Sequence, residues 1–203
     1  MPAWPARLDP VLDGARVRME PLAEHHRPGL RVAASHPEIW RWIEPYPAGS
    51  EAAWDAWFDT ALARIAAGEE AAFATVDAAT GELLGSSRYL VLRPADRGLE
   101  IGSTWLTPAA WGTGANVEAK LLMLGYAFEA LGCIRVELKT HAANDRSRGA
   151  MTRMGAVFEG VHRKHRIVPG IGVRDSAWFS VLDEEWPAVQ RGLRERLSPP
   201  AKP

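Results

Sequence analysis

Two glycines, Gly112 and Gly114, lie one residue apart in the stretch WLTPAAWGTGANVEAK, between a strand-like run and a helix-like run. Glycine lets the backbone approach a ligand closely, and the first turn of a helix offers unpaired N–H groups and the positive end of the helix dipole. A phosphate or pyrophosphate suits this combination. The stretch therefore predicts an anion-binding turn, and a plain turn without a ligand is the alternative.

Three kinds of phosphate site compete for this turn. No lysine followed by serine or threonine comes after the second glycine, which excludes a Walker-type loop. A dinucleotide-binding fold would place a third glycine near Val117 and the turn early in the chain, whereas several predicted strands precede it here. The remaining interpretation is a turn that holds the pyrophosphate of a coenzyme A.

The stretch from residue 99 to residue 160 resembles the GNAT N-acetyltransferase superfamily, and within it the subgroup that includes the ribosomal-protein N-terminal acetyltransferases. The resemblance rests on glutamate-isoleucine-glycine at residues 100–102, the WGTG turn, the pair Glu118 and Ala119, and the segments NDRS and RMGAVFEG. In order of elements it extends over residues 15–187. One departure is Ala109, where many members carry glutamine or arginine, so we expect a side-chain contact to the coenzyme to be missing and the backbone cradle to be unaffected.

The resemblance implies acetyl-CoA as cosubstrate, no metal, and a splayed pair of parallel strands at the centre of the sheet. It places the strand STWLT beside the thioester, with N–H groups near Trp105 and Leu106 stabilising the oxyanion. Asn144 is expected against the pantetheine arm and Ser147 near the sulfur. The coenzyme-binding residues expected from the resemblance are Trp105, Leu106, Thr107, Trp111, Gly112, Thr113, Gly114, Ala115, Asn116, Val117, Asn144 and Ser147.

Acetyl transfer to an amine requires a neutral amine, a polarised carbonyl and a proton for the leaving thiolate. Ser147 is the candidate general acid, and its alternative role is to satisfy a backbone N–H in the first turn of a short helix. Glu100 is the candidate general base through the family likeness. Glu159 is the second candidate, for which we favour a solvated or ion-paired carboxylate.

The acceptor is left open by these residues. A protein α-amino group has an unperturbed pKa of about 7.7–8.0, against about 10.4 for lysine, so a weak base suffices for a protein N-terminus. A small-molecule amine such as an antibiotic, polyamine or amino acid is equally compatible, because the fold does not determine the acceptor. A non-catalytic acyl-CoA-binding module is the hypothesis from a different class, and the presence of Glu100, Asn144 and Ser147 disfavours it.

Composition bounds the remaining classes. The chain has 203 residues, of which 47% are hydrophobic and 24% charged, and a formal net charge of -1, which gives no reason to expect nucleic acid as a partner. No segment reaches the roughly 20 apolar residues of a spanning helix, and no signal peptide is visible, so we expect a cytoplasmic protein without a membrane partner. The single cysteine, Cys133, is expected in the core. A homodimer is an expectation of the family likeness alone.

Alternating and helical patterns predict an α/β fold with one mixed, mostly antiparallel sheet and helices on both faces. Strands are expected at 15–22, on both sides of the turn DAATGE, and at 98–107, 133–140, 156–168 and 173–182. Helices are expected at 50–68 with Ser50 as cap, at 144–155, and along an apolar stripe at Val117, Leu121, Leu124, Phe128 and Leu131. The expected division is an N-terminal arm at 1–14, one acetyltransferase domain at 15–190 and a partly disordered tail at 191–203.

For the histidines and most of the aromatic residues, we favour a surface or packing role over a role in a binding site. His25 and His26 are expected at the surface, and His162 and His165 would face opposite sides of a strand, so no histidine set has ligand spacing. The tryptophans of the first helices either line the acceptor site or pack those helices onto the sheet, and packing is favoured for most of Trp40, Trp42, Trp54 and Trp57. Trp111 would shield the coenzyme. Six basic residues of the second half either form a solvated face or contact the 3′-phosphate of the coenzyme or an acidic acceptor. They are Arg146, Arg148, Arg153, Arg163, Lys164 and Arg166.

Overall fold

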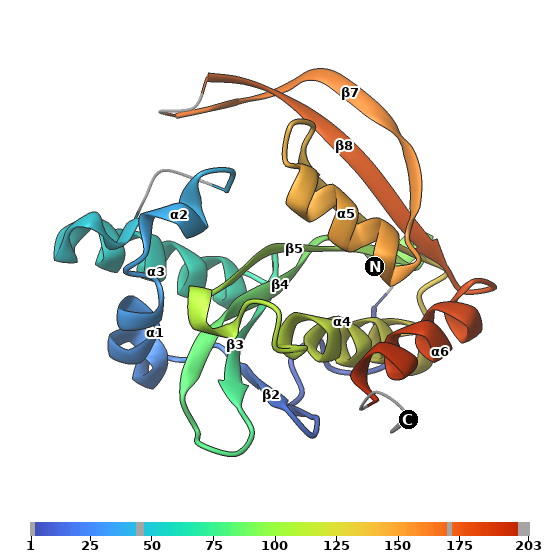
Figure 1. The fold of residues 1–203 in the computed structure, drawn as a ribbon, viewed down its shortest axis with the longest axis horizontal. Helices are drawn as coiled ribbons and strands as arrows, with labels where there is room; N and C mark the ends of the chain where they lie inside the picture. The colour runs from blue at the N-terminus through green and yellow to red at the C-terminus, as the bar shows by residue number, and fades with distance from the viewer. Residues whose placement is uncertain (1–2, 44–46, 170–171, 199–203) are drawn as a thin grey trace, which may run out of the picture.

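The protein, analysed as a computed structural model, is built on one eight-stranded sheet in the order β1-β2-β3-β4-β5-β6-β8-β7. The structure describes residues 3–43, 47–169 and 172–198 (Figure 1). All neighbouring strands are antiparallel except β5 and β6. The strands are β1 Leu12–Asp13, β2 Val17–Pro21, β3 Ala71–Asp77, β4 Leu83–Arg93, β5 Gly98–Leu106, β6 Arg135–His141, β7 Val157–Val168 and β8 Gly172–Leu182.

The parallel strands β5 and β6 separate along their length. Their register includes only three pairs, from Gly98↔Arg135 to Glu100↔Glu137, although β5 continues to Leu106 and β6 to His141. Beyond Glu100 the edge of β5 therefore faces a gap. The predicted α/β fold with a central splayed parallel pair is confirmed.

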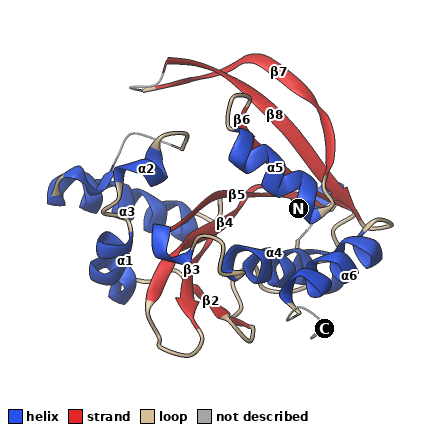
Figure 2. Ribbon diagram, in the orientation of Figure 1, coloured by secondary structure: helices blue, strands red, loops and turns tan. Residues whose placement is uncertain are grey.

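Helices cover both faces of this sheet (Figure 2). One face carries α1 Arg27–Ala33, α2 Pro37–Trp40 and α3 Glu51–Ala66, which pack on alternate side chains of β3 and on Trp105. The other face carries α4 Ala115–Gly125, which continues as a π-helical turn over Tyr126–Ala130, and α6 Trp186–Leu197. Helix α5 Asp145–Met154 follows β6 and lies beside the gap.

Capping chemistry places the helix ends where the sequence predicts them. Ser50 accepts a hydrogen bond from the Ala53 N–H, and Asn144 accepts one from the Ser147 N–H. Gly155 ends α5 with φ of 99°, a left-handed conformation in which glycine is favoured. Helix α6 was not predicted. It runs across the expected start of the tail at residue 191 and buries Leu193, whereas residues 199–203 lie outside the described part.

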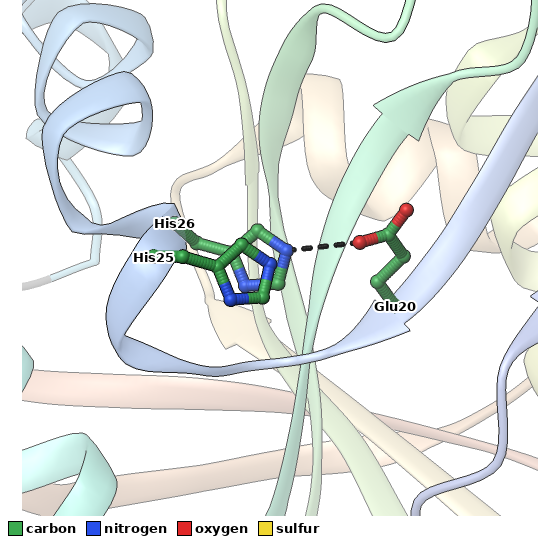
Figure 3. Close-up of side chains that lie close together, drawn as sticks. All are labelled: Glu20, His25 and His26. Carbon is green, nitrogen blue, oxygen red and sulfur yellow. Dashed lines mark hydrogen bonds and ion pairs between the residues drawn. The ribbon is translucent and has the colours of Figure 1, made fainter.

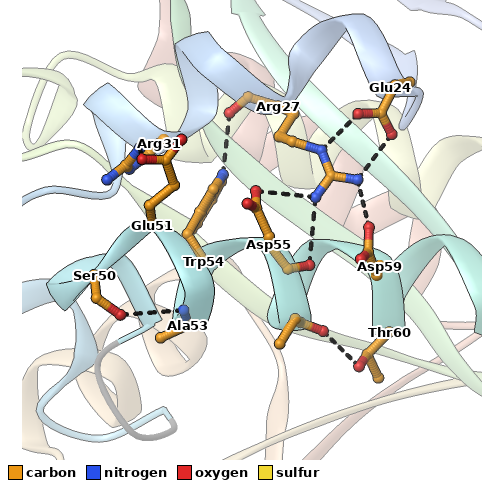
Figure 4. Close-up of polar contacts among 11 residues, drawn as sticks. Glu24, Arg27, Arg31, Ser50, Glu51, Ala53, Trp54, Asp55, Asp59 and Thr60 are labelled. Carbon is orange, nitrogen blue, oxygen red and sulfur yellow. Dashed lines mark hydrogen bonds and ion pairs between the residues drawn. The ribbon is translucent and has the colours of Figure 1, made fainter.

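Arg27 fastens α1 to α3. Its guanidinium contacts Glu24 in the preceding turn, Asp55 at 3.3 Å and Asp59, and its carbonyl accepts the Trp54 Nε1–H at 3.1 Å (Figure 4). The carboxylates raise the pKa of Arg27 above its usual value. The segment between α1 and α3 lines the cleft described below, so this network fixes the two helices that flank one wall of the cleft.

Glu118 ties the N-terminal part of the chain to α4. Its buried carboxylate accepts backbone N–H groups of Ala15, Arg16 and Val17 at 3.1, 2.6 and 2.7 Å. The glutamate of the Glu118–Ala119 pair that supports the resemblance therefore has a structural role. Within the described ranges, no helix is long and apolar enough to cross a membrane.

Replacing Glu118 with alanine is expected to lower the free energy of unfolding by about 3 kcal/mol, because it leaves three backbone N–H groups, including that of the buried Val17, without their acceptor. Urea denaturation measures the change. Glu69→Ala, at an exposed carboxylate after α3, is the control and should stay within about 0.5 kcal/mol of the wild type. Equal stability of the two variants would contradict the assigned role of Glu118.

Candidate functional site

A cleft of about 850 Å³ opens where β5 and β6 separate. Its walls come from α2 and the residues after it, β5, the glycine turn, the first turns of α4, α5, β6 and the β7–β8 hairpin. Ten of the twelve expected coenzyme-binding residues and the candidate base Glu100 line it. The two exceptions are Thr107, whose N–H donates to the Leu84 carbonyl, and Ala115, which is buried.

The glycine turn has the backbone that only glycine adopts readily. Gly112 has φ of 78° and Gly114 has φ of 93°, and Gly114 is the N-cap of α4. The Ala115 N–H donates to Thr113 Oγ1 at 3.3 Å, so one N–H of this first turn has a partner within the turn. The turn forms the wall of the cleft at the N-terminus of α4, which is suited to an anion.

Four arginines gather at this end of the cleft. Arg16 donates to the carbonyls of Thr113 at 3.4 Å and Leu197 at 3.1 Å, and the Arg146 guanidinium lies 3.9 Å from the Trp111 ring centroid. None of the four forms an ion pair with a residue that the structure describes, so their charge is available to a ligand. They are Arg16, Arg146, Arg153 and Arg196. Arg16 and Arg196 were missed, because they are far from the turn in sequence.

The register of β5 orients its backbone N–H groups. The Thr107 N–H donates to the Leu84 carbonyl of β4, and the next residue, Leu106, is opposite Gly85. In an antiparallel pair, hydrogen-bonded and non-hydrogen-bonded positions alternate, so the Leu106 N–H faces away from β4. The Trp105 N–H faces β4. The Leu106 carbonyl also faces away and accepts the Trp111 Nε1–H at 2.9 Å. Of the two expected oxyanion donors, the geometry favours Leu106.

Glu100 and Gly102 occupy one face of β5. The Glu100 carboxylate is buried, and its Oε2 accepts Lys139 Nζ at 2.6 Å. A Cβ at position 102 would lie 2.7 Å from Glu100 Oε1, so the glycine of glutamate-isoleucine-glycine makes room for this carboxylate. Oε1 makes no hydrogen bond within the described chain, which leaves one carboxylate oxygen able to accept a proton.

Ser147 and Asn144 lie together at the start of α5. The amide oxygen of Asn144 accepts the Ser147 N–H at 3.2 Å. The Ser147 hydroxyl makes no hydrogen bond with the described residues, so it does not satisfy a backbone N–H and is available to a ligand.

Glu159, the second candidate base, lies outside the lining of the cleft. Arg135 Nη1 donates to its Oε1 at 2.7 Å and Ser180 Oγ donates at 2.8 Å, and Arg135 holds the pKa of Glu159 below its usual value. The prediction of an ion-paired carboxylate is confirmed.

Two histidine predictions are wrong. The surface prediction holds for His25, which is exposed, but His26 is buried, with its Nε2 bonded to Glu20 of β2 at 3.0 Å and its Nδ1 accepting the Ala23 N–H (Figure 3). Side-chain nitrogen or oxygen atoms of Glu20, His25 and His26 all lie within 4.8 Å of one another. His162 and His165 lie on the same side, with ring centroids 5.9 Å apart. A bulge between His162 and Arg166, with Lys164 at φ of 50°, breaks the alternation that would have separated them.

The tryptophans divide into packing and site residues. Trp40, Trp54 and Trp57 pack with one another and with Trp105, as expected for most of the group. Trp42 lines the cleft, and its ring lies 4.7 Å from that of His141.

Lys120 is a site residue that sequence reasoning missed. Its side chain lines the cleft from α4, is buried, and donates to Thr104 Oγ1 at 2.6 Å and Ser87 Oγ at 3.1 Å. Burial lowers the pKa of Lys120 to about 7. The signal was present in the sequence, since a lysine three residues after Val117 and four before Leu124 falls on the predicted apolar stripe.

Comparisons with known proteins agree with this geometry. The family model described as "Acetyltransferase (GNAT) domain" matches residues 16–157. The "Putative ribosomal N-acetyltransferase YdaF" of Bacillus subtilis (strain 168) is 32% identical over 106 residues, which cover 52% of this chain and only 57% of that relative. A GCN5-related N-acetyltransferase from Brucella melitensis is 35% identical, with a TM-score of 0.87 over 97% of this chain and 89% of that one. Mycobacterium smegmatis RimJ, solved with CoA-disulfide, is 22% identical with a TM-score of 0.75 over 95% of each chain, a likeness of fold.

Proposed function

This chain belongs to the GNAT family of acetyltransferases, and we propose that it transfers the acetyl group of acetyl-CoA directly to a primary amine. The observation that carries the proposal is the cleft at the β5–β6 gap. At one end it has a glycine turn with four arginines that form no ion pair with a described residue, and in its wall a buried carboxylate, Glu100. The phosphates of coenzyme A fit the first feature, because backbone N–H groups and guanidinium groups both bind phosphate oxygens.

Each residue then has a defined task. The turn from Gly112 to Val117 and the arginines bind the phosphates, and Asn144 lies against the pantetheine arm. The Leu106 N–H donates to the thioester carbonyl as negative charge develops there. Glu100 accepts the proton of the attacking amine at Oε1, and Ser147 donates a hydrogen bond to the sulfur.

The acceptor that we propose is a protein N-terminal amine. The name of the Bacillus subtilis relative specifies ribosomal N-acetylation, and it supports this choice for the shared part of the two chains. The low pKa of an α-amine also suits Glu100, a carboxylate base whose other oxygen is already bonded to Lys139. We further propose that the protein acts in the cytoplasm.

The test is thiol release from acetyl-CoA with a panel of peptides with free N-termini and a panel of small amines. Release with peptides supports the proposed acceptor, and release only with small amines replaces it by a small-molecule acceptor. Coenzyme binding without release on either panel would favour the non-catalytic module.

Ser147→Ala is expected to lower kcat about tenfold with the Kd for coenzyme A within twofold of the wild type, because the hydroxyl acts on the sulfur and not on the phosphates. Thr152→Ala is the control on the same helix, since Thr152 is exposed and outside the lining. Wild-type turnover in Ser147→Ala would end the assignment of Ser147.

A further inference from the structure

Lys120 is a buried amine for which the proposed reaction has so far no task. It is 6% exposed, and its partners are two neutral hydroxyls, those of Ser87 on β4 and Thr104 on β5. Ionisable groups on the surrounding elements are bonded elsewhere. Tyr89 on β4 donates to the Met123 carbonyl, Glu100 on β5 bonds Lys139 of β6, and Glu118 on α4 accepts N–H groups of residues 15–17.

The two hydroxyls and the ammonium form a closed triangle. Lys120 donates to both oxygens, and Ser87 Oγ lies 2.7 Å from Thr104 Oγ1. Either hydroxyl can be the donor in this contact; because Ser87 is completely buried and does not line the cleft, we assign its proton to Thr104 Oγ1, the hydroxyl oxygen 2.7 Å away. Thr104 Oγ1 then accepts two hydrogen bonds, and its proton is the one left over. Because Thr104 lines the cleft, this assignment leaves its proton available to a ligand there.

A bulge of β5 sets the position of Thr104. Gly102 is opposite Arg88 and Trp105 is opposite Ser86, so Ser87 faces both Ser103 and Thr104, and Ser103 has φ of 47°. Thr104 and Leu106 are two residues apart, so they share one face of the strand. Both residues line the cleft, so the Thr104 hydroxyl is a polar group on the same short stretch of β5 as the Leu106 N–H, along which the thioester is proposed to lie.

We propose that Lys120 supplies, through the Thr104 hydroxyl, the proton that the leaving coenzyme A thiolate takes up. The inference rests on the proposed acetyl transfer. The amine nitrogen bonds to the acetyl carbon and the C–S bond breaks, with its electron pair staying on sulfur. Thr104 gives its proton to the sulfur and takes one from the Lys120 ammonium, which becomes a neutral amine. The proton of the acceptor amine leaves through Glu100, and Lys120 regains a proton from solvent after product release.

This route gives the cleft a proton source that Ser147 does not provide. The Ser147 hydroxyl has no ionisable partner among the described residues, so it can orient the sulfur but has no group behind it that restores a proton. Lys120, in contrast, stands behind Thr104 as a group that can restore the proton. Burial disfavours the charged ammonium and lowers the pKa of Lys120 to about 7, so the ammonium gives up a proton readily near neutral pH.

The test is the pH dependence of kcat at saturating acetyl-CoA and peptide in Lys120→Met, Thr104→Val and Thr104→Ser. The wild type should lose activity as pH rises above about 7, because the ammonium is lost. Lys120→Met and Thr104→Val should lower kcat about tenfold at pH 6.5 and lack this descending limb, since a thiolate leaves tolerably without an acid. Thr104→Ser should keep the limb. Lys164→Met, at an exposed lysine of β7, is the control and should match the wild type.

A second measurement does not depend on turnover. The folded pKa of Lys120 lies below the ordinary 10.5, so between about 7 and 10.5 the unfolded chain binds more protons and stability rises with pH. Wild type should therefore gain stability relative to Lys120→Met between pH 6 and pH 9 in urea denaturation. A difference that stays constant with pH would overturn the proton route, as would a descending limb that persists in Lys120→Met. Wild type without thiol release for any acceptor would overturn the proposed function, and this route with it.

Discussion

Replacing Glu100 with glutamine is expected to lower kcat for acetyl transfer by about a hundredfold, with the Kd for coenzyme A nearly unchanged. The amide cannot accept the proton of the attacking amine, and general base catalysis typically contributes about 10²–10⁴-fold. Glutamine has nearly the same volume as glutamate, so the contact with Gly102 is preserved. Steady-state kinetics with a peptide acceptor and calorimetric titration of coenzyme A measure the two effects.

Two variants separate the base from its ion pair. Glu159→Gln removes a carboxylate that pairs with Arg135 outside the cleft, and its kcat should stay within twofold of the wild type. Lys139→Met removes the partner of Glu100 but keeps the carboxylate, so its kcat should fall less than that of Glu100→Gln. Equal losses in Lys139→Met and Glu100→Gln would assign the effect to the ion pair, and wild-type turnover in Glu100→Gln would refute a catalytic base at this position.

Replacing Gly114 with valine is expected to raise the Kd for coenzyme A at least tenfold, which is about 1.4 kcal/mol of binding free energy. Two causes act together. A β-branched residue is strained at φ of 93°, so the turn that presents the first N–H groups of α4 must change shape. A Cβ at this position would also lie 3.4 Å from Arg16 Cδ, so a larger side chain displaces that guanidinium.

Gly81→Val is the matched control for strain. Gly81 has φ of 76° in the turn between β3 and β4, and a Cβ there would meet nothing within 4 Å. Both variants should lower the melting temperature by similar amounts, since both place valine in the left-handed region, while only Gly114→Val should weaken binding. An unchanged Kd in Gly114→Val would move the pyrophosphate site to another part of the molecule.

Local chemistry made much of the architecture predictable. Ser50 and Asn144 begin helices because their side chains accept the free N–H groups of a first turn, and Gly155 ends one because it adopts positive φ. Val17 and Met19 alternate with charged residues and are buried in β2. The assignment of individual residues to coenzyme binding and catalysis stays a prediction that the experiments above address.

Predictions failed where a bulge or a distant segment intervened. Two extra residues in β7 between His162 and Arg166 interrupt the alternation and put His162 and His165 on one side, and strand alternation cannot reveal such an insertion. His26 is adjacent to a second histidine in a polar segment, which suggested the surface, but Glu20 and the Ala23 N–H satisfy both of its ring nitrogens in a buried turn.

By itself, the sequence determined the glycine turn, the helix caps, the splayed α/β fold and the family, because each depends on neighbouring residues or on motifs at set spacings. Only the tertiary structure decided that Glu100 pairs with Lys139 and that Arg16 reaches Thr113. It also decided that Lys120 donates hydrogen bonds to Ser87 and to Thr104 at the bulge of β5. These partners lie 16 to 97 positions apart in the chain, so sheet register and helix packing bring them together, and short-range patterns carry no information about either.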